Sequence, residues 1–168
     1  YFPYARQDRV AVPGETLSAA VMAGIINQLN CSMVTVLDPH SDVSAALVNN
    51  LRVVTQAGCV SLSRELVGLI KDQDSILIAP DAGASKKIYK LASEFDTNRV
   101  TVLDKDRDPI NGVITGIKYS YGISDLTGKT AIIVDDICDG GRTFIEAAKV
   151  LRSLGASKVI LYVTHGLF

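Results

Sequence analysis

Short apolar runs alternate with amphipathic stretches along this 168-residue chain. The runs are rich in Val, Ile and Leu, and their length is typical of buried parallel strands. We therefore predict strands over residues 33–37, 75–79, 100–103, 131–134 and 159–163.

Helical stretches separate these strands and carry recognisable boundaries. They are predicted over residues 15–28, 62–71, 84–95 and 144–154. The last has apolar residues at helical spacing and stops at Gly155, a favoured residue after a helix end. Strands alternating with helices favour an α/β fold with a doubly wound parallel sheet. Residues 106–126 show weak periodicity and predict a flexible loop or an exposed hairpin, which would suit a mobile lid.

Composition narrows the class of protein. Hydrophobic residues make up 48% of the chain, and a net charge of -1 gives no reason to expect nucleic acid or a membrane as partner. Cys31, Cys59 and Cys138 have no metal-ligand spacing and form no even disulfide set, which indicates a reducing compartment. We expect no membrane span and no signal peptide, and hence a cytoplasmic enzyme.

The segment 130–144 carries the clearest chemistry. An apolar strand runs into acids, and a glycine turn then opens a helix, which together suit a phosphorylated sugar. The glycines let successive N–H groups point at one anion, and the start of the helix adds its positive dipole end. Carboxylates can hold ribose hydroxyls or a magnesium shell. The candidate sugar-phosphate residues are Asp135, Asp136, Asp139, Gly140, Gly141, Arg142 and Thr143.

This segment resembles the ribose-phosphate signature of type I phosphoribosyltransferases. It equally resembles that of the ribose-phosphate diphosphokinases, which are also called phosphoribosyl pyrophosphate synthetases. The pattern of two apolar residues, two acids, a third acid and a small-residue turn is shared by both groups. The alternative is an ordinary strand–turn–helix whose acids face water.

Residues 1–10 favour the diphosphokinases. The run Tyr-Phe-Pro-Tyr-Ala-Arg-Gln-Asp-Arg is similar to their ATP-site segment, which ordinary phosphoribosyltransferases lack. Arg6 and Arg9 suit triphosphate oxygens, and Gln7 suits an adenine edge. Taken in isolation, the same run would be a solvated polar turn.

Three further segments resemble the same family in the same order. Residues 36–42 bring His40, which the resemblance implies near the ATP phosphates and magnesium. Residues 78–84 bring Asp81, implied at a second metal position, so that His40 and Asp81 are the metal candidates. Residues 103–107 resemble the start of the mobile catalytic loop, with Lys105 and Arg107 as catalytic cations.

Each of these residues also has a simpler interpretation. His40 could be a hydrogen-bonded loop histidine, and Asp81 could be a helix N-cap. Lys105 and Arg107 could belong to a solvated charge cluster, since acids alternate with them.

The resemblance implies the type I phosphoribosyltransferase fold and a definite reaction. The diphosphoryl group of MgATP would pass to the anomeric hydroxyl of ribose 5-phosphate, giving phosphoribosyl pyrophosphate and AMP. It further implies Mg²⁺ as cofactor, ATP as co-substrate and a homo-oligomeric enzyme. Either Asp135 or Asp136 could orient the attacking hydroxyl.

Members of this family are longer than this chain. We therefore expect the chain, residues 1–168, to be the central part of a longer two-domain enzyme. Residues 1–30 would end the N-terminal domain region, and residues 31–168 would form the remainder, including the ribose-phosphate loop.

Two departures from the family pattern keep alternatives open. Gly140 stands where a threonine is usual, and Arg142 replaces a small residue. Acids also separate the basic residues of the catalytic-loop segment. A larger acceptor such as ADP-ribose is one alternative, and a phosphoribosyltransferase or a non-catalytic regulatory homologue is another. A non-catalytic homologue would be expected to lose His40, Asp81 or Lys105, and all three are present.

Overall fold

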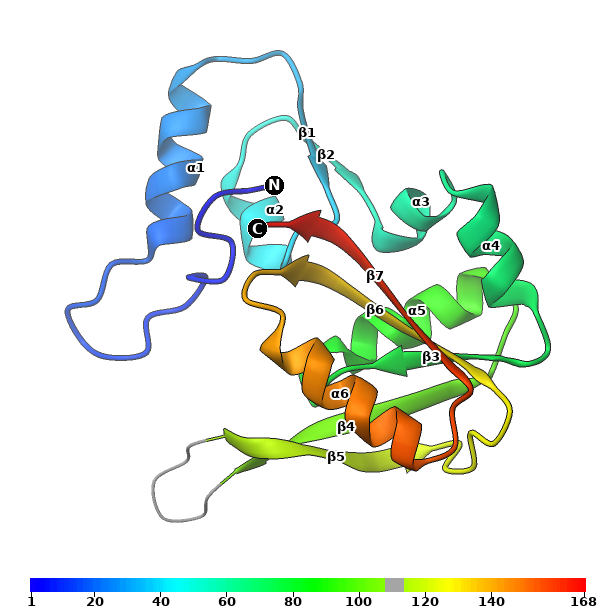
Figure 1. The fold of residues 1–168 in the computed structure, drawn as a ribbon. Coiled ribbons are helices and arrows are strands. Elements are labelled where there is room, and N and C mark those ends of the chain that lie inside the picture. Colours follow the sequence, from blue (N-terminus) through cyan, green and yellow to red (C-terminus); the bar gives the residue numbers. More distant parts are fainter. Residues whose placement is uncertain (108–113) are drawn as a thin grey trace. The chain divides into compact units, whose positions relative to one another are not determined.

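The computed structural model describes residues 1–107 and 114–168, which form two compact units (Figure 1). The first unit is Tyr1–Cys59 and the second is Val60–Phe168. The predicted division at residue 30, and the expectation that the chain is the central part of a longer two-domain enzyme, remain predictions.

The first unit holds a small parallel sheet and short helices. Its elements are α1 (Ser18–Gln28), β1 (Val34–Leu37), α2 (Asp42–Leu47), β2 (Leu51–Val54) and the start of α3 (Gln56–Val60). β1 and β2 pair in parallel, with Val34 opposite Leu51 and Leu37 opposite Val54. The sequence predicted α1 and β1, but not α2, β2 or α3. Those three are four to six residues long, too short to show a periodicity.

The core of this unit fixes its N-terminal segment. Phe2 and Ala5 are buried and pack with Ala19 and Ala23 of α1 and with Val36 of β1. The backbone between them turns, with Tyr4 at φ 59. Residues 6–9 therefore follow directly on a turn whose position is fixed by the buried side chains of Phe2 and Ala5.

The second unit is a layered α/β structure. Its elements are α4 (Arg64–Lys71), β3 (Ser75–Ala79), the 3-10 turn η1 (Ala82–Ala84), α5 (Ser85–Glu94), β4 (Val100–Arg107), β5 (Ile114–Gly122), β6 (Thr130–Cys138), α6 (Arg142–Ser153) and β7 (Lys158–Gly166). The strand order is β5-β4-β3-β6-β7. All neighbours are parallel except β4 and β5. The predicted α/β class with a mostly parallel sheet is confirmed.

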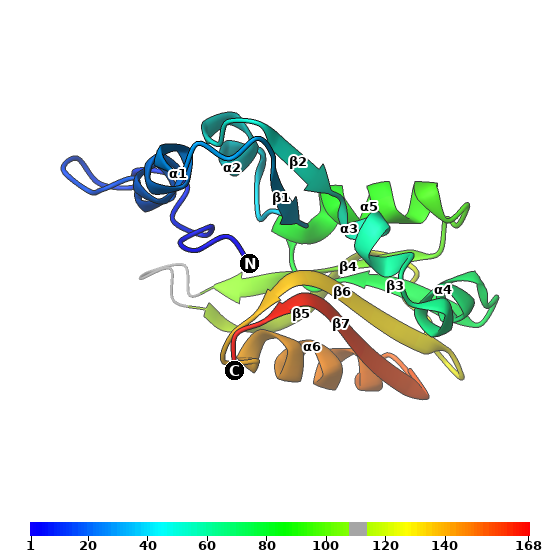
Figure 2. The ribbon, with the colours of Figure 1, turned by 90° about the horizontal axis from the view of Figure 1, so that it is seen from above.

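Helices cover both faces of this sheet (Figure 2). On one face Phe144, Ala147 and Leu151 of α6 pack on Ile76 and Ile133, all of them buried. α5 lies on the opposite face, over β3 and β4 (Figure 2). Because successive strand residues point to opposite faces, each central strand is apolar throughout, and β3 is buried along its whole length.

The weakly periodic segment 106–126 includes the end of β4 and the whole of β5, which pair as an antiparallel hairpin. β4 continues through Arg107 and pairs with β5, so that Thr101 lies opposite Gly122 and Arg107 opposite Ile114. A hairpin was one of the two structures predicted here. The predicted lid function falls partly on residues 108–113, which lie outside the described residues. Within the described ranges no helix combines the length and apolarity needed to cross a bilayer.

Gly122 is a position where the hairpin requires glycine. Its φ is +106, and a Cβ there would lie 2.4 Å from the Val100 carbonyl oxygen. We expect Gly122→Ala to lower the free energy of unfolding by at least about 2 kcal/mol, measured by urea denaturation. Gly116→Ala is the matched control on the same strand, since a Cβ there meets nothing within 4 Å. Equal stability of the two variants would contradict this account.

Candidate active site

The strand order brings three sequence motifs of the second unit to one edge of the sheet. β3 lies between β4 and β6 and is parallel to both, so their carboxyl ends share one edge. The chain leaves β3 toward β4 on one side, and β6 lies on the other side. Ligands of open α/β sheets bind outside the carboxyl ends of strands at such a switch in direction. Asp81, Lys105 and the pair Asp135 and Asp136 come from these three strand ends.

Asp81 and Lys105 form an ion pair. Lys105 Nζ lies 2.5 Å from Asp81 Oδ2, and both side chains are about three-quarters buried, with 25% and 23% of their surface exposed. Asp81 Oδ1 also accepts a hydrogen bond from the Ala84 N–H at 3.1 Å. Asp81 is thus a cap of η1, as its simpler interpretation predicted. It also contacts a predicted catalytic cation.

The neighbouring acids of β6 differ in burial and in their partners. Asp136 is buried, with 5% exposed, and Lys87 Nζ of α5 donates to its Oδ2 at 3.2 Å. Asp135 is half-buried and follows Ile133, which faces α6. The Asp136 N–H donates to Asp135 Oδ1 at 2.9 Å. The two neighbouring carboxylates therefore have different surroundings: Asp136 is buried beside Lys87, and Asp135 is half-buried.

Lys87 was not predicted as a site residue, although the sequence carried a signal for it. It lies in the first turn of α5, where the positive end of the helix dipole disfavours a cation. Two adjacent lysines at such a position break a local rule, and such violations are expected at functional sites.

Asp135 has a strongly perturbed pKa. Burial raises the pKa of its carboxyl to about 7, and the side-chain hydrogen bond with Asp136 and the negative charge of Asp136 act in the same direction, whereas the bond from the Asp136 N–H acts against them. The charge of Asp81 adds a smaller effect. A carboxyl of this kind can accept and release a proton near neutral pH.

The predicted phosphate loop links β6 to α6. Asp139, Gly140 and Arg142 are exposed, and Thr143 is half-buried. Gly141 has φ +72 at the N-cap, which is the glycine turn that the sequence predicted. No side chain caps α6 in the described structure, and Phe144 and Ile145 direct their N–H groups to the Gly141 carbonyl.

Comparison with known proteins identifies the family. Residues 54–166 match the phosphoribosyl transferase domain. The chain belongs to this family. The chain is similar over its whole length to ribose-phosphate pyrophosphokinases of Mycoplasma pneumoniae, at 33% identity, and Mycoplasmopsis pulmonis, at 31%. It spans 49% and 50% of those relatives, about half their length.

A solved structure agrees with this similarity. The crystal structure of phosphoribosylpyrophosphate synthetase from Mycobacterium smegmatis superposes with a TM-score of 0.80 at 26% identity, covering 99% of this chain and 52% of that one. The predicted resemblance to ribose-phosphate diphosphokinases and the predicted type I phosphoribosyltransferase fold are confirmed.

The remaining predicted site residues lie in the first unit, except Arg107, whose side chain falls outside the described structure. Arg6, Gln7 and Arg9 are exposed in the first unit, and His40 is half-buried after β1. Their meeting with the residues of the second unit remains a prediction. Arg107 is the last residue of β4.

The site chemistry suits a metal held jointly with a substrate. Among the residues that the structure describes, no three His, Cys, Asp or Glu side chains could hold a metal ion together. Mg²⁺ in phosphoryl-transfer sites is usually bound by one or two carboxylates plus substrate phosphates. Burial is the main cause of the raised pKa of Asp135, and the negative charges of Asp136 and Asp81 add to it; a cation bound nearby would lower this pKa.

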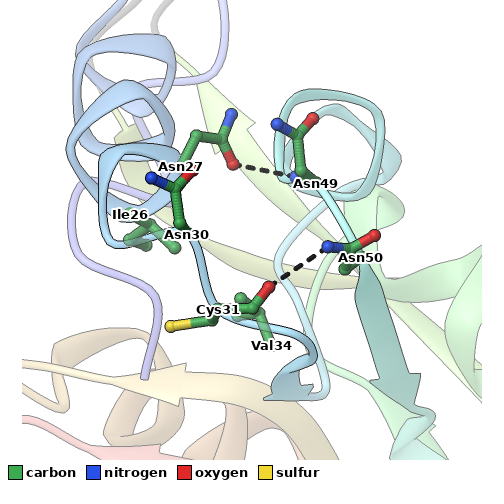
Figure 3. Close-up of a pocket in the computed structure, with 7 residues that line it drawn as sticks. All are labelled: Ile26, Asn27, Asn30, Cys31, Val34, Asn49 and Asn50. Atoms are coloured by element: carbon green, nitrogen blue, oxygen red, sulfur yellow. Dashed lines mark hydrogen bonds between the residues drawn. The ribbon is translucent and has the colours of Figure 1, made fainter.

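A small polar pocket of about 110 Å³ lies in the first unit (Figure 3). It is lined by Ile26, Asn27, Asn30, Cys31, Val34, Asn49 and Asn50. Val34 begins β1, and Asn50 directly precedes β2. The pocket therefore lies at the amino ends of these strands, whereas His40 follows the carboxyl end of β1. It is not the site that the sequence predicted.

The perturbed pKa of Asp135 predicts a pH dependence of stability. An unfolded aspartate titrates near pH ~4, so the folded chain binds an extra proton between about pH 4 and 7. The free energy of unfolding should therefore fall as pH rises through this window. We expect the wild-type Tm to drop between pH 5 and pH 8 by roughly 3 °C or more beyond that of Asp135→Asn.

Thermal unfolding of both proteins at the two pH values checks this expectation. Glu94→Gln, at an exposed carboxyl that ends α5, is the matched control and should retain the wild-type pH dependence. A wild-type pH dependence in Asp135→Asn would show that another group is responsible.

Proposed function

We propose that the full-length protein is a ribose-phosphate diphosphokinase. The observation that carries this proposal is the extent of the similarity. The phosphoribosyl transferase domain begins at residue 54, yet the ribose-phosphate pyrophosphokinases match the whole chain. Residues 1–53 include Arg6, Gln7, Arg9 and His40, which a phosphoribosyltransferase would not need for ATP. This favours the diphosphokinase reaction over transfer of a base.

The acceptor would be held by the β6–α6 segment. N–H groups at the start of α6 and the Gly141 turn suit the 5-phosphate, because they present donors and a positive dipole end. Asp139, Gly140, Arg142 and Thr143 complete this loop. The acid pair would bind the ribose hydroxyls.

In the proposed reaction the anomeric hydroxyl oxygen attacks the β-phosphorus of ATP. The bond from that phosphorus to the oxygen shared with the α-phosphate breaks, and AMP leaves with that oxygen. Asp135 is the group of the acid pair that can take the hydroxyl proton at neutral pH. Lys105 and Arg107 would neutralise charge on the transferred group.

Mg²⁺ would be the cofactor, with His40 and Asp81 as the proposed ligands. Bound there with ATP, it would supply further charge neutralisation on the phosphates. Arg6 and Arg9 would bind triphosphate oxygens, and Gln7 an adenine edge. We further propose a cytoplasmic homo-oligomer.

The test is incubation of the full-length protein with MgATP and ribose 5-phosphate. We expect AMP and phosphoribosyl pyrophosphate in equal amounts, separated by chromatography. ADP-ribose in place of ribose 5-phosphate tests the alternative of a larger acceptor, which Arg142 suggested. Nucleotide and pyrophosphate formed from phosphoribosyl pyrophosphate and a purine base, with no AMP from ATP, would establish a phosphoribosyltransferase instead.

Lys105 should act mainly on transition-state charge. We expect Lys105→Ala to lower kcat by roughly 10²–10⁴-fold while changing the KM for ATP little. Lys118→Ala is the matched control, since Lys118 belongs to the same hairpin and pairs with exposed Asp106 at 2.8 Å. Unchanged turnover in Lys105→Ala would remove this lysine from the mechanism.

A further inference from the structure

The buried carboxylate of Asp136 forms an ion pair with a lysine of α5. Asp136 is almost fully enclosed in β6, on the face toward α5, and its side chain has 7% of its surface exposed. A carboxylate buried in this way is costly unless it is paired and hydrogen-bonded. Lys87 Nζ lies 3.2 Å from Asp136 Oδ2 and forms an ion pair with it, and 29% of the lysine side chain is exposed.

The position of Lys87 is itself unfavourable without this carboxylate. It lies in the first turn of α5, where the helix dipole disfavours a cation. Lys90, three residues later on the same helix, is exposed. The ion pair with Asp136 offsets the unfavourable interaction of the Lys87 charge with the helix dipole.

Asp135 is coupled to this pair through the backbone. The Asp136 N–H donates to Asp135 Oδ1 at 2.9 Å, so the direction of the Asp135 carboxylate follows the placement of Asp136. Within the described part of the chain, no lysine or arginine forms an ion pair with Asp135. The two acids thus differ: Asp136 is paired with Lys87 inside the fold, and the half-buried Asp135 remains for a ligand.

We propose that Lys87 is a positioning residue, which holds Asp136 as a fixed inner carboxylate so that Asp135 is aligned on the ribose. This inference rests on the proposed function. Lys87 then acts through Asp136 and contacts neither ATP nor the sugar phosphate. Loss of Lys87 removes this ion pair from a buried carboxylate, which shifts the acid pair and weakens acceptor binding.

A double-mutant cycle tests this role in the full-length protein. We expect Lys87→Met to raise the Kd and the KM for ribose 5-phosphate by roughly tenfold to a hundredfold, with little change in the KM for ATP. In an Asp136→Asn background the same substitution should change acceptor binding by less than about threefold, because no buried charge remains to be paired. Calorimetry with ribose 5-phosphate and steady-state kinetics give the two readouts.

Two further variants separate positioning from general damage to the fold. Lys87→Arg keeps the charge and should restore acceptor binding to within about threefold of wild type. Lys90→Met is the matched control on α5 and should behave as wild type. If Lys87→Met does not fold, as judged by thermal unfolding, Lys87→Gln takes its place in the cycle.

The outcomes distinguish this inference from the proposed function. Equal effects of Lys87→Met in both backgrounds would show that Lys87 contacts the substrate directly, and would overturn the positioning role while leaving the enzyme a diphosphokinase. A raised KM for ATP alone would overturn it as well. Wild-type protein that binds ribose 5-phosphate but forms no AMP would contradict the proposed function, and the calorimetric cycle would still test Lys87. Wild-type protein that does not bind ribose 5-phosphate would contradict both.

Discussion

The parallel alignment of β4, β3 and β6 is the constraint on which the rest of the second unit depends. Parallel hydrogen bonding obliges these neighbouring strands to end at one edge. Residues far apart in the chain therefore meet there without any local sequence code. Asp81 and Lys105 are in contact although 24 positions separate them, as their numbers show. The site is a consequence of strand order.

Charge balance at this edge follows from the same arrangement. Three carboxylates, Asp81, Asp135 and Asp136, are gathered in partly buried surroundings where each would repel the others. Lys105 pairs with the first and Lys87 with the third. Burial, with a further contribution from the neighbouring negative charges, raises the pKa of the Asp135 carboxyl to about 7. Burial and ion pairing thus give three aspartates of the same chemistry different partners and surroundings.

Local sequence rules accounted for the long, regular elements. The strand 75–79 agrees with β3 at both ends, and the helix after Ser61 and that before Gly155 were found because their apolar periodicity is strong. β6 extends four residues beyond its predicted end. Its last residues include Asp135 and Asp136, and polar residues in a buried strand carry no local sign of strand structure. The sequence predicted a loop or a hairpin over residues 106–126, but not the bounds of β5, because β5 is stabilised by its pairing with β4 and not by a local pattern.

By itself, the sequence determined the α/β class, the glycine turn before α6 and the residue types that suit a sugar phosphate, because propensity, periodicity and turn chemistry are local properties. The family resemblance added most of the candidate site residues. Only the tertiary structure decided that Lys87 pairs with Asp136, and that the adjacent acids of β6 differ in burial. The pairing depends on which helix packs on which face of the sheet, and that choice is made by long-range packing.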